Sequence, residues 1–360
     1  MLAQVKKLAG DDFAGRLSAW WNGRDYTPPE ASEDGEAAAE AVAAKEAPAK
    51  QPEPEQPETK PVVVAAATPE AEPGAAQTAN GASMRIRALE TLWGEGRLAP
   101  GSFALDTHLL DAALELADQP GDIGFIGADG ALLNAFAAQS ERNAIASEWR
   151  SDCVGHVAEA APKASVTGGE VDRPRAFTEG AFPAVISIEA FAFADHKAGL
   201  VGRVHRALDE KGRWVFLDTT RKTNKTPAEA FASAWAEPQL ATDEEIEELL
   251  LLAGFKTVRK VPANDLVLAA AKQGYANLAQ VLEDASRQGL SGREGALFLQ
   301  ELAWEAQSWR ARMRAIEGGA LDVNIWVADK SEQHGPLGFM LNEVVRPDDA
   351  GAADTLFEQA

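Results

Sequence analysis

The chain has 360 residues, a formal net charge of −22 and a hydrophobic fraction of 46%. This size and hydrophobic content suffice for a sizeable core, and the uneven composition favours one globular body with appendages over two separate domains. The excess of acidic residues argues against a general nucleic-acid binder, because a phosphate backbone repels an acidic surface.

Cysteine and histidine are scarce. The single cysteine, Cys153, permits no internal disulfide, and the five histidines show no zinc-ligand spacing. Asp11 and Asp12 stand where a signal peptide would need an apolar stretch, and no run reaches the roughly 18 apolar residues of a membrane span. We therefore expect a soluble, cytoplasmic protein without a bound metal.

The N-terminal part predicts a tethered docking segment. Residues 1–26 contain apolar side chains at helical spacing, namely Phe13, Leu17, Trp20 and Trp21. Adjacent tryptophans are frequent binding anchors, so the segment from Phe13 to Trp21 predicts a protein or membrane-surface partner. The alternative is that it folds back onto its own domain. Residues 27–83 are rich in Ala, Pro and Glu and lack aromatic residues, which predicts a disordered acidic linker.

Residues 84–330 predict one domain of alternating helices and strands. Apolar runs predict strands at 123–126, 145–148, 164–167, 184–188, 213–217, 256–261 and 322–328. Helical patterns occupy 86–93, 106–116, 131–139, 195–208, 243–252 and 266–316. Lys211 and Gly212 are expected to mark the stop that follows the helix 195–208, since glycine accepts the left-handed conformation found at helix ends. The remaining residues, 331–360, predict a flexible acidic tail.

This alternation predicts an α/β fold with a doubly wound, mostly parallel seven-stranded sheet of the Rossmann-like type. The final strand enters after two helices, which favours an antiparallel orientation for that terminal strand. The run Ala184 to Ile188 has no alternation and is typical of a strand buried on both faces. Ligand sites in such sheets lie at the carboxyl ends of the strands.

Several segments, taken in order, resemble class I S-adenosylmethionine-dependent methyltransferases. They are LWGEGRLAPGS, GFIGADGALLNAFA, AIASEW, VISIEAFAFADHKAGLVGRVHRAL, GRWVFLDTT and EEIEELLLLAGFKTV. Within that class they are most similar to the phosphoethanolamine and sarcosine type of small-molecule N-methyltransferases. The resemblance covers about residues 88–330 and implies S-adenosylmethionine as cofactor.

The resemblance also assigns the cofactor residues. It places Gly124, Gly127, Asp129 and Gly130 in the segment GFIGADG, which spans the first strand and the loop after it. A carboxylate after the second strand, Glu148, is expected at the ribose hydroxyls, and Glu170 after the third strand at the adenine amine. The loop GFIGADG departs from the family pattern D-x-G-x-G-x-G, because Ile126 and Ala128 replace two glycines. Pro183 likewise stands where the family has an aspartate.

The acceptor end is assigned less fully. Methyl transfer depends mainly on proximity and desolvation, so no catalytic triad is expected. Glu189 matches a family position near cofactor and acceptor, and His196 is a candidate base. Asp218 and Thr219 end the fifth strand and are expected either to touch the substrate or to terminate the strand.

The late helices carry an aromatic stripe, formed by Phe298, Leu302, Trp304 and Trp309, that favours core or lid packing over a cation cage. The arginines Arg310, Arg312 and Arg314 are expected to face solvent. The domain's single tyrosine, Tyr275, also lies in this region.

Two hypotheses of function follow. The first is an enzyme that transfers a methyl group from S-adenosylmethionine to a small-molecule or lipid-like amine or hydroxyl acceptor. The second is a catalytically inactive methyltransferase-like adaptor that binds a protein partner through Trp20 and Trp21.

Overall fold

A computed structural model describes residues 84–115, 119–222, 240–288 and 292–331. The predicted N-terminal segment with Trp20 and Trp21, the linker 27–83 and all but the first residue of the tail lie outside the described residues. Among the described residues, no helix is long and apolar enough to cross a membrane.

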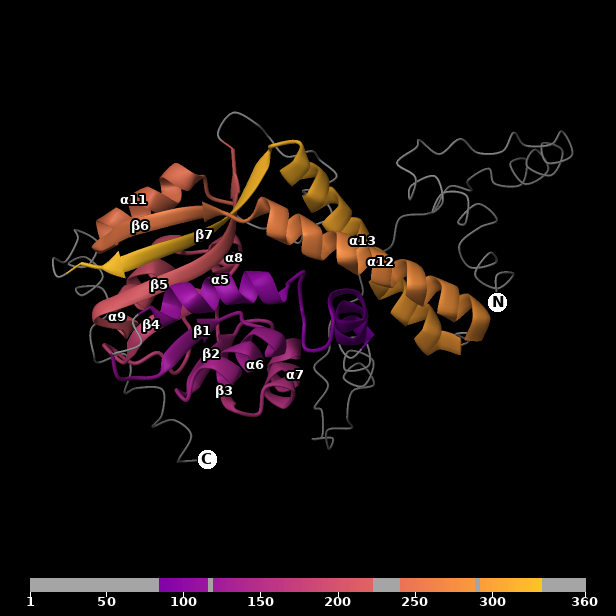
Figure 1. The fold of residues 1–360 in the computed structure, drawn as a ribbon, viewed down its shortest axis with the longest axis horizontal. Helices are drawn as coiled ribbons and strands as arrows, with labels where there is room; N and C mark the ends of the chain where they lie inside the picture. The colour runs from indigo at the N-terminus through magenta and orange to yellow at the C-terminus, as the bar shows by residue number, and fades with distance from the viewer. Residues whose placement is uncertain (1–83, 116–118, 223–239, 289–291, 332–360) are drawn as a thin grey trace, which may run out of the picture. The chain divides into compact units, whose positions relative to one another are not determined.

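Seven strands of the described chain form one sheet, in the order β3-β2-β1-β4-β5-β7-β6. The strands are β1 (Ile123–Ile126), β2 (Ala144–Glu148), β3 (Ala164–Gly168), β4 (Phe182–Ile188), β5 (Leu208–Arg221), β6 (Phe255–Pro262) and β7 (Leu321–Lys330). The pairs among β1 to β5 are parallel, whereas β7 runs antiparallel to both β5 and β6. The predicted mostly parallel sheet with an antiparallel terminal strand is confirmed (Figure 1).

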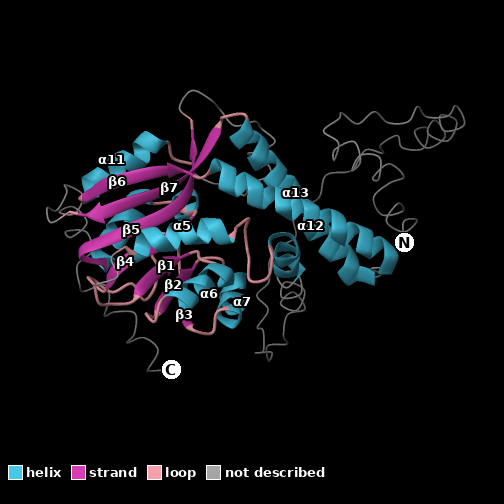
Figure 2. Cartoon of the chain, viewed as in Figure 1, coloured by secondary structure: helices cyan, strands magenta, loops and turns pink. Residues whose placement is uncertain are grey.

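Helices connect the strands and pack on the sheet (Figure 2). They are a helix over 84–93, α5 (Phe103–Leu114), α6 (Gly130–Gln139), α7 (Val154–Ala160), α8 (Ala190–Phe193), α9 (Lys197–Ala207), α11 (Asp243–Ala253), α12 (Asn264–Gln288) and α13 (Gly292–Glu317). Helix α6 contacts both α5 and α7, and α9 contacts α11. The long helices α12 and α13 lie side by side.

Side-chain caps fix where several helices begin. The Ser102 hydroxyl accepts from the backbone N–H of Leu105, so α5 starts three residues before its predicted start. At α11, Thr242 and Glu245 form a reciprocal capping box, which satisfies backbone donors that the first helical turn leaves unpaired. Gly254, at φ +95°, ends that helix in the left-handed conformation.

The boundary between α9 and β5 differs from the prediction. The helix ends at Ala207 and β5 begins at Leu208, so Lys211 and Gly212 belong to the strand rather than to a helix stop. The register with β4 shifts here, because Phe182 pairs with Leu208 whereas Ala184 pairs with Arg213. The extra residues of β5 form an irregularity next to Pro183, which has no backbone N–H to offer the sheet.

The core contains a cluster of aromatic rings on the central strands. Trp214 and Phe216 of β5 have ring centroids 4.5 Å apart, and Phe216 stacks on Trp326 of β7 at 5.8 Å. Phe191 of α8 stacks on Trp214 at 5.3 Å. These fully buried rings join β5, β7 and the short helix after β4, and so fix the strand end that carries Glu189.

Candidate functional site

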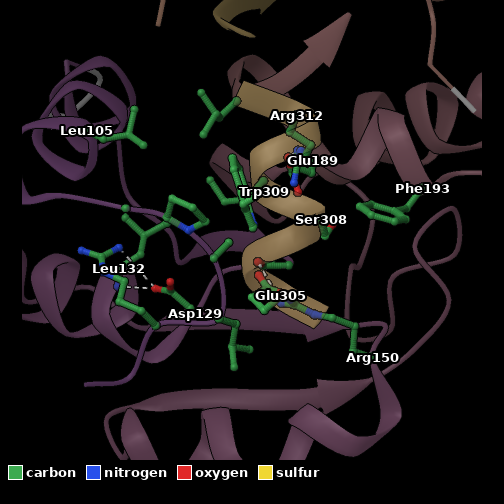
Figure 3. Close-up of a pocket in the computed structure, with 18 of the residues that line it drawn as sticks. Leu105, Asp129, Leu132, Arg150, Glu189, Phe193, Glu305, Ser308, Trp309 and Arg312 are labelled. Carbon is green, nitrogen blue, oxygen red and sulfur yellow. Dashed lines mark hydrogen bonds and ion pairs between the residues drawn. The ribbon is translucent and has the colours of Figure 1, made fainter. Parts of the chain in front are cut away.

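A cavity of about 360 Å³ opens at the carboxyl ends of the central parallel strands. Gly127 reaches it from β1, Trp149 and Arg150 from β2, Glu189 from β4 and Leu217 from β5. Further parts of the wall come from the 84–93 helix, the loop before α5, and the helices α5, α6, α8 and α13. Glu305, Ser308, Trp309 and Arg312 of α13 are labelled in Figure 3. Open α/β sheets bind ligands at this edge.

The turn after β1 places Gly127 at the cavity wall. Gly127 has φ +69°, a backbone conformation that residues other than glycine rarely adopt. Its N–H donates to the Ser147 carbonyl at 3.0 Å, which ties the turn to β2. Asp129 then caps α6 by accepting from the backbone N–H of Leu132 at 2.9 Å.

Arg97 links two carboxylates at one end of the cavity. Its Nη1 donates to Asp106 Oδ1 at 3.0 Å and lies 3.6 Å from Asp129 Oδ1. Burial alone would lower the pKa of Arg97, but the hydrogen bonds to Asp106 and the charge of Asp129 raise it. Burial also raises the pKa of Asp129, against the opposing charge of Arg97. This end therefore carries both signs of charge within a partly enclosed space.

Glu148 ends β2 and is almost completely buried, with 1% of its surface exposed. Arg150 occupies both of its carboxylate oxygens: Nε donates to Oε1 at 2.6 Å and Nη2 to Oε2 at 2.7 Å. The backbone N–H of Arg150 also donates to Oε1, at 2.8 Å. Burial alone would lower the pKa of Arg150. The hydrogen bonds to Glu148 and its negative charge outweigh burial and raise the pKa of Arg150 above the ordinary arginine value.

Glu189 follows β4 in a strained backbone conformation. It has φ +54° and ψ +21°, and its N–H donates to the Leu217 carbonyl at 2.7 Å. A residue other than glycine in this region costs about 1 kcal/mol or more, and such strain is often found at functional sites. The Glu189 carboxylate pairs with the guanidinium of Arg312 on α13. Figure 3 shows the two side chains next to each other.

Arg312 is buried among groups of the same cavity. Its guanidinium lies over the Trp309 ring, 4.0 Å from the centroid, and Nη2 is 3.5 Å from Thr219 Oγ1. Only 5% of the residue is exposed. Arg312 therefore joins the end of β5, the end of β4 and α13 at one point.

Asp218, near the end of β5, lies beneath the part of the cavity that contains Glu189 and Arg312. It is fully buried and accepts from the backbone N–H groups of Phe191, Ala192 and Thr219 at 2.7 to 3.0 Å. Burial and the charge of Glu189 raise the pKa of Asp218 to about 8, against the opposing effect of these three donors. These hydrogen bonds join α8 to the end of β5, and Asp218 itself does not line the cavity.

No protein-family model and no curated protein matches this chain. Among solved structures, it is similar to a phosphoethanolamine N-methyltransferase 2 of Haemonchus contortus, with a TM-score of 0.58 and 14% identity over 68% of this chain and 57% of that one. It is also similar to a candidate sarcosine dimethylglycine methyltransferase of Galdieria sulphuraria, with a TM-score of 0.55 and 14% identity over 69% of this chain and 99% of that one.

The chain has the fold of these methyltransferases. A third similar structure, the [4+2]-cyclase SpnF, has a TM-score of 0.52 and 12% identity over 71% of this chain and 95% of that one. The methyltransferase fold is therefore shown by the structure, whereas the reaction must be argued from the site itself. The chain spans 57% of the length of the Haemonchus protein, so nothing of that protein's activity is carried over by this likeness.

Within the methyltransferase fold, four of the predicted site residues gather around the cavity. Gly127, Asp129 and Glu189 line it, and Glu148 lies directly behind Arg150. Gly130 begins α6 and faces the neighbouring helix, since a Cβ at this position would meet Ala160.

The structure places the other predicted site residues away from the cavity. Gly124 lies inside β1, where a Cβ would meet Phe177 and Val185. Glu170 has a side chain that is 71% exposed and pairs with Arg173. His196 is exposed at the N-cap of α9 and makes no side-chain cap there. Within the described residues, no group of three or more His, Cys, Asp and Glu side chains is placed to hold a metal.

Sequence reasoning was wrong about Arg312, which was expected to face solvent. A signal was available, because Trp309, Arg312 and Ile316 recur at i, i+3 and i+7 and so share the buried face of α13. The stripe itself is confirmed as packing for Phe298, Leu302 and Trp309, which are buried. Trp304 is different, since 48% of it is exposed at the cavity wall.

Three further cavity residues were not singled out. Arg97 lies within the segment LWGEGRLAPGS. Of its two acidic partners, Asp106 is nine residues away, whereas Asp129 is brought to it by the fold. Arg150 and Trp149 adjoin Glu148, and only the fold shows that both turn back into the cavity. Tyr275, in contrast, lies outside the lining and donates to the Ala306 carbonyl at 2.5 Å, which links α12 to α13.

Proposed function

We propose that this domain transfers a methyl group from S-adenosylmethionine to a small-molecule or lipid-like amine or hydroxyl acceptor. The observation that carries the proposal is a single cavity that joins two sets of residues at the carboxyl ends of β1, β2, β4 and β5. The first set, around Gly127 and Arg97, suits a nucleoside with an amino-acid tail. The second set, around Glu189, places a carboxylate beside apolar side chains.

The first set fits the cofactor by its chemistry. The backbone at Gly127 has no side chain of its own and permits close approach. Arg97 would bind the carboxylate of an amino-acid tail, and Asp129 its ammonium group. Glu148 would accept hydrogen bonds from ribose hydroxyls. When bound, the cofactor supplies a methyl group activated by a sulfonium.

The second set would hold the acceptor. Glu189 would accept a hydrogen bond from the acceptor's N–H or O–H and take up its proton. Arg312 keeps that carboxylate in place from α13 and offers a positive charge to an anionic group on the acceptor. Phe193 and Trp309 form apolar walls, which reduce the access of water to the reacting atoms.

A binding and transfer experiment tests the proposal. The full chain is titrated with S-adenosylmethionine and S-adenosylhomocysteine by calorimetry, and transfer of a labelled methyl group is then measured on a panel of amines and hydroxyl compounds. We expect binding, and we expect Glu189→Gln to reduce transfer by about 10²–10⁴-fold, the usual contribution of a general base, with unchanged affinity for S-adenosylhomocysteine.

The matched control is Arg259→Ala, which removes a half-exposed arginine that pairs with Glu115 away from the cavity. It should leave binding and transfer unchanged. Absence of heat with either ligand at millimolar concentration, in the wild type and in the cavity variants described below, would contradict the proposal. The adaptor hypothesis concerns Trp20 and Trp21, which lie outside the described residues.

A further inference from the structure

The two residues after β2 fold back onto the parts of the cavity that a nucleoside would use. Arg150 donates three hydrogen bonds to Glu148, one from its backbone and two from its guanidinium. Both oxygens of this buried carboxylate are therefore engaged by the chain itself. A ribose could reach Glu148 only in exchange for the guanidinium.

Trp149 covers the second part, the glycine turn. A Cβ built on Gly127 would overlap the six-membered ring of Trp149, so the ring lies directly against the backbone of the turn. The same ring has its centroid 5.9 Å from that of Phe193, on the acceptor side of the cavity. Trp149 thus bridges the cavity between the glycine turn and α8.

The two side chains also hold each other. The Arg150 guanidinium lies over the Trp149 ring, 5.1 Å from its centroid, and Nη2 is 3.4 Å from the Gly127 carbonyl oxygen. Cation–π contact and the bidentate pair with Glu148 therefore act on one guanidinium. Movement of either side chain removes support from the other.

We propose that Trp149 and Arg150 form a plug that closes the cofactor end of the cavity, and that a nucleoside ligand binds only after both side chains have moved out. The inference rests on the proposed function, because it concerns the same site. It assigns to these two residues control over ligand affinity rather than a part in methyl transfer.

The plug has a defined thermodynamic consequence. A ligand that binds only the open state shows an apparent Kd equal to the intrinsic Kd divided by the open fraction. If the open state is populated at about 1–10%, removing the plug tightens apparent binding by about 10–100-fold. Because Phe193 contacts Trp149, an acceptor that displaces this ring would also favour the open state.

The experiment measures the affinity of the full chain for S-adenosylhomocysteine by calorimetry. We expect Arg150→Ala and Trp149→Ala each to bind about tenfold tighter than the wild type or better. Arg150→Lys should fall in between, because lysine keeps the charge but cannot form the bidentate pair. Arg259→Ala, the control defined above, should retain the wild-type Kd.

Thermal unfolding provides a second readout that does not depend on activity. Without ligand, Arg150→Ala should unfold at a lower temperature than the wild type, because the buried Glu148 carboxylate loses its partner. With saturating S-adenosylhomocysteine its unfolding temperature should rise by more than that of the wild type. Trp149→Ala keeps the Glu148–Arg150 pair intact and tests the plug if Arg150→Ala does not fold.

The outcomes separate the plug from the proposed function. If the wild type binds the ligand and both Arg150→Ala and Trp149→Ala bind equally or more weakly, the plug is overturned while the proposed function stands. If neither the wild type nor any variant binds, the plug and the proposed function are both overturned. Tighter binding by Trp149→Ala and Arg150→Ala supports the plug.

Discussion

At the scale of single residues, the pair of Glu189 and Arg312 is the most consequential contact of the site. It joins the strained residue after β4 to a helix more than one hundred residues later in the chain. Both side chains are largely removed from water, with exposed fractions of 17% and 6%. A buried pair of this kind tolerates the loss of both charges better than the loss of one.

We expect Arg312→Ala to lower the free energy of unfolding by about 3–5 kcal/mol, because it leaves the Glu189 carboxylate buried without its partner. Urea denaturation followed by circular dichroism measures this. The double variant Glu189→Gln with Arg312→Met keeps similar volumes and removes both charges, so its loss should be clearly smaller. Equal losses in the single and double variants would show that the unpaired Glu189 carboxylate is not the cause of the destabilisation.

At this scale the sequence predicts residue types better than residue partners. Glu148 and Glu189 follow apolar strands, and the position of a carboxylate at a strand end can be read locally. Arg312 could not be paired with Glu189 in this way, because the contact depends on how α13 packs across the sheet. Glu170 and His196 were reasonable candidates by position in sequence, but the loops that carry them turn toward solvent.

At the scale of elements, the turn between β1 and α6 decides what the cavity admits. Its backbone adopts a left-handed conformation at Gly127 and then enters α6 through the Asp129 cap. The family pattern of alternating glycines is reduced here, yet the residue that faces the cavity is still a glycine. The close packing of Trp149 on it explains why no side chain fits.

We expect Gly127→Ala to lower the free energy of unfolding by about 2–4 kcal/mol, through backbone strain and overlap of the new methyl with Trp149. Adding Trp149→Ala should recover part of this loss, because the overlap with the ring is removed while the backbone strain and the close contact with the Ile188 carbonyl oxygen remain. Urea denaturation of both single variants and the double variant gives the coupling energy. Additive losses would place Trp149 away from Gly127 in solution.

Apart from β5, the predicted strands lie within two residues of the observed bounds, because their apolar runs end at polar or turn residues. The strand β5 is the exception, since it starts five residues before its prediction. The segment Leu208–Gly212 contains charged residues and a glycine, which locally resemble a helix stop. Pairing with β4 overrides that local signal, so the sheet partner was needed to place the boundary.

At the scale of the whole described domain, the helix over 84–93 is locked onto the α12 and α13 helices. Trp93 donates from Nε1 to Glu305 at 3.1 Å and meets Trp309 edge-on, with centroids 5.7 Å apart. Gly274 of α12 leaves the room that the Trp93 ring fills, because a Cβ there would overlap the ring. Asn277 adds a hydrogen bond to the Leu92 carbonyl at 2.7 Å.

We expect Trp93→Ala to lower the free energy of unfolding by about 3–5 kcal/mol, because it removes a large buried ring and leaves the Glu305 carboxylate without one donor. Trp304→Ala is the matched control, since Trp304 is 48% exposed and its loss should cost about 1 kcal/mol or less. Chemical denaturation of the two variants side by side measures the difference. Similar losses would mean that the 84–93 helix contributes little to the domain.

The antiparallel strand β7 has a consequence for how the chain folds during synthesis. It is made after all the other described strands, yet it lies between β5 and β6 and is the strand with which β6 pairs in the described sheet. Until residues 321–330 leave the ribosome, the long edge of β5 and the whole of β6 have no partner there. Such exposed edges can pair with other chains, so we expect an aggregation-prone stage of the nascent chain that lasts until β7 has been made.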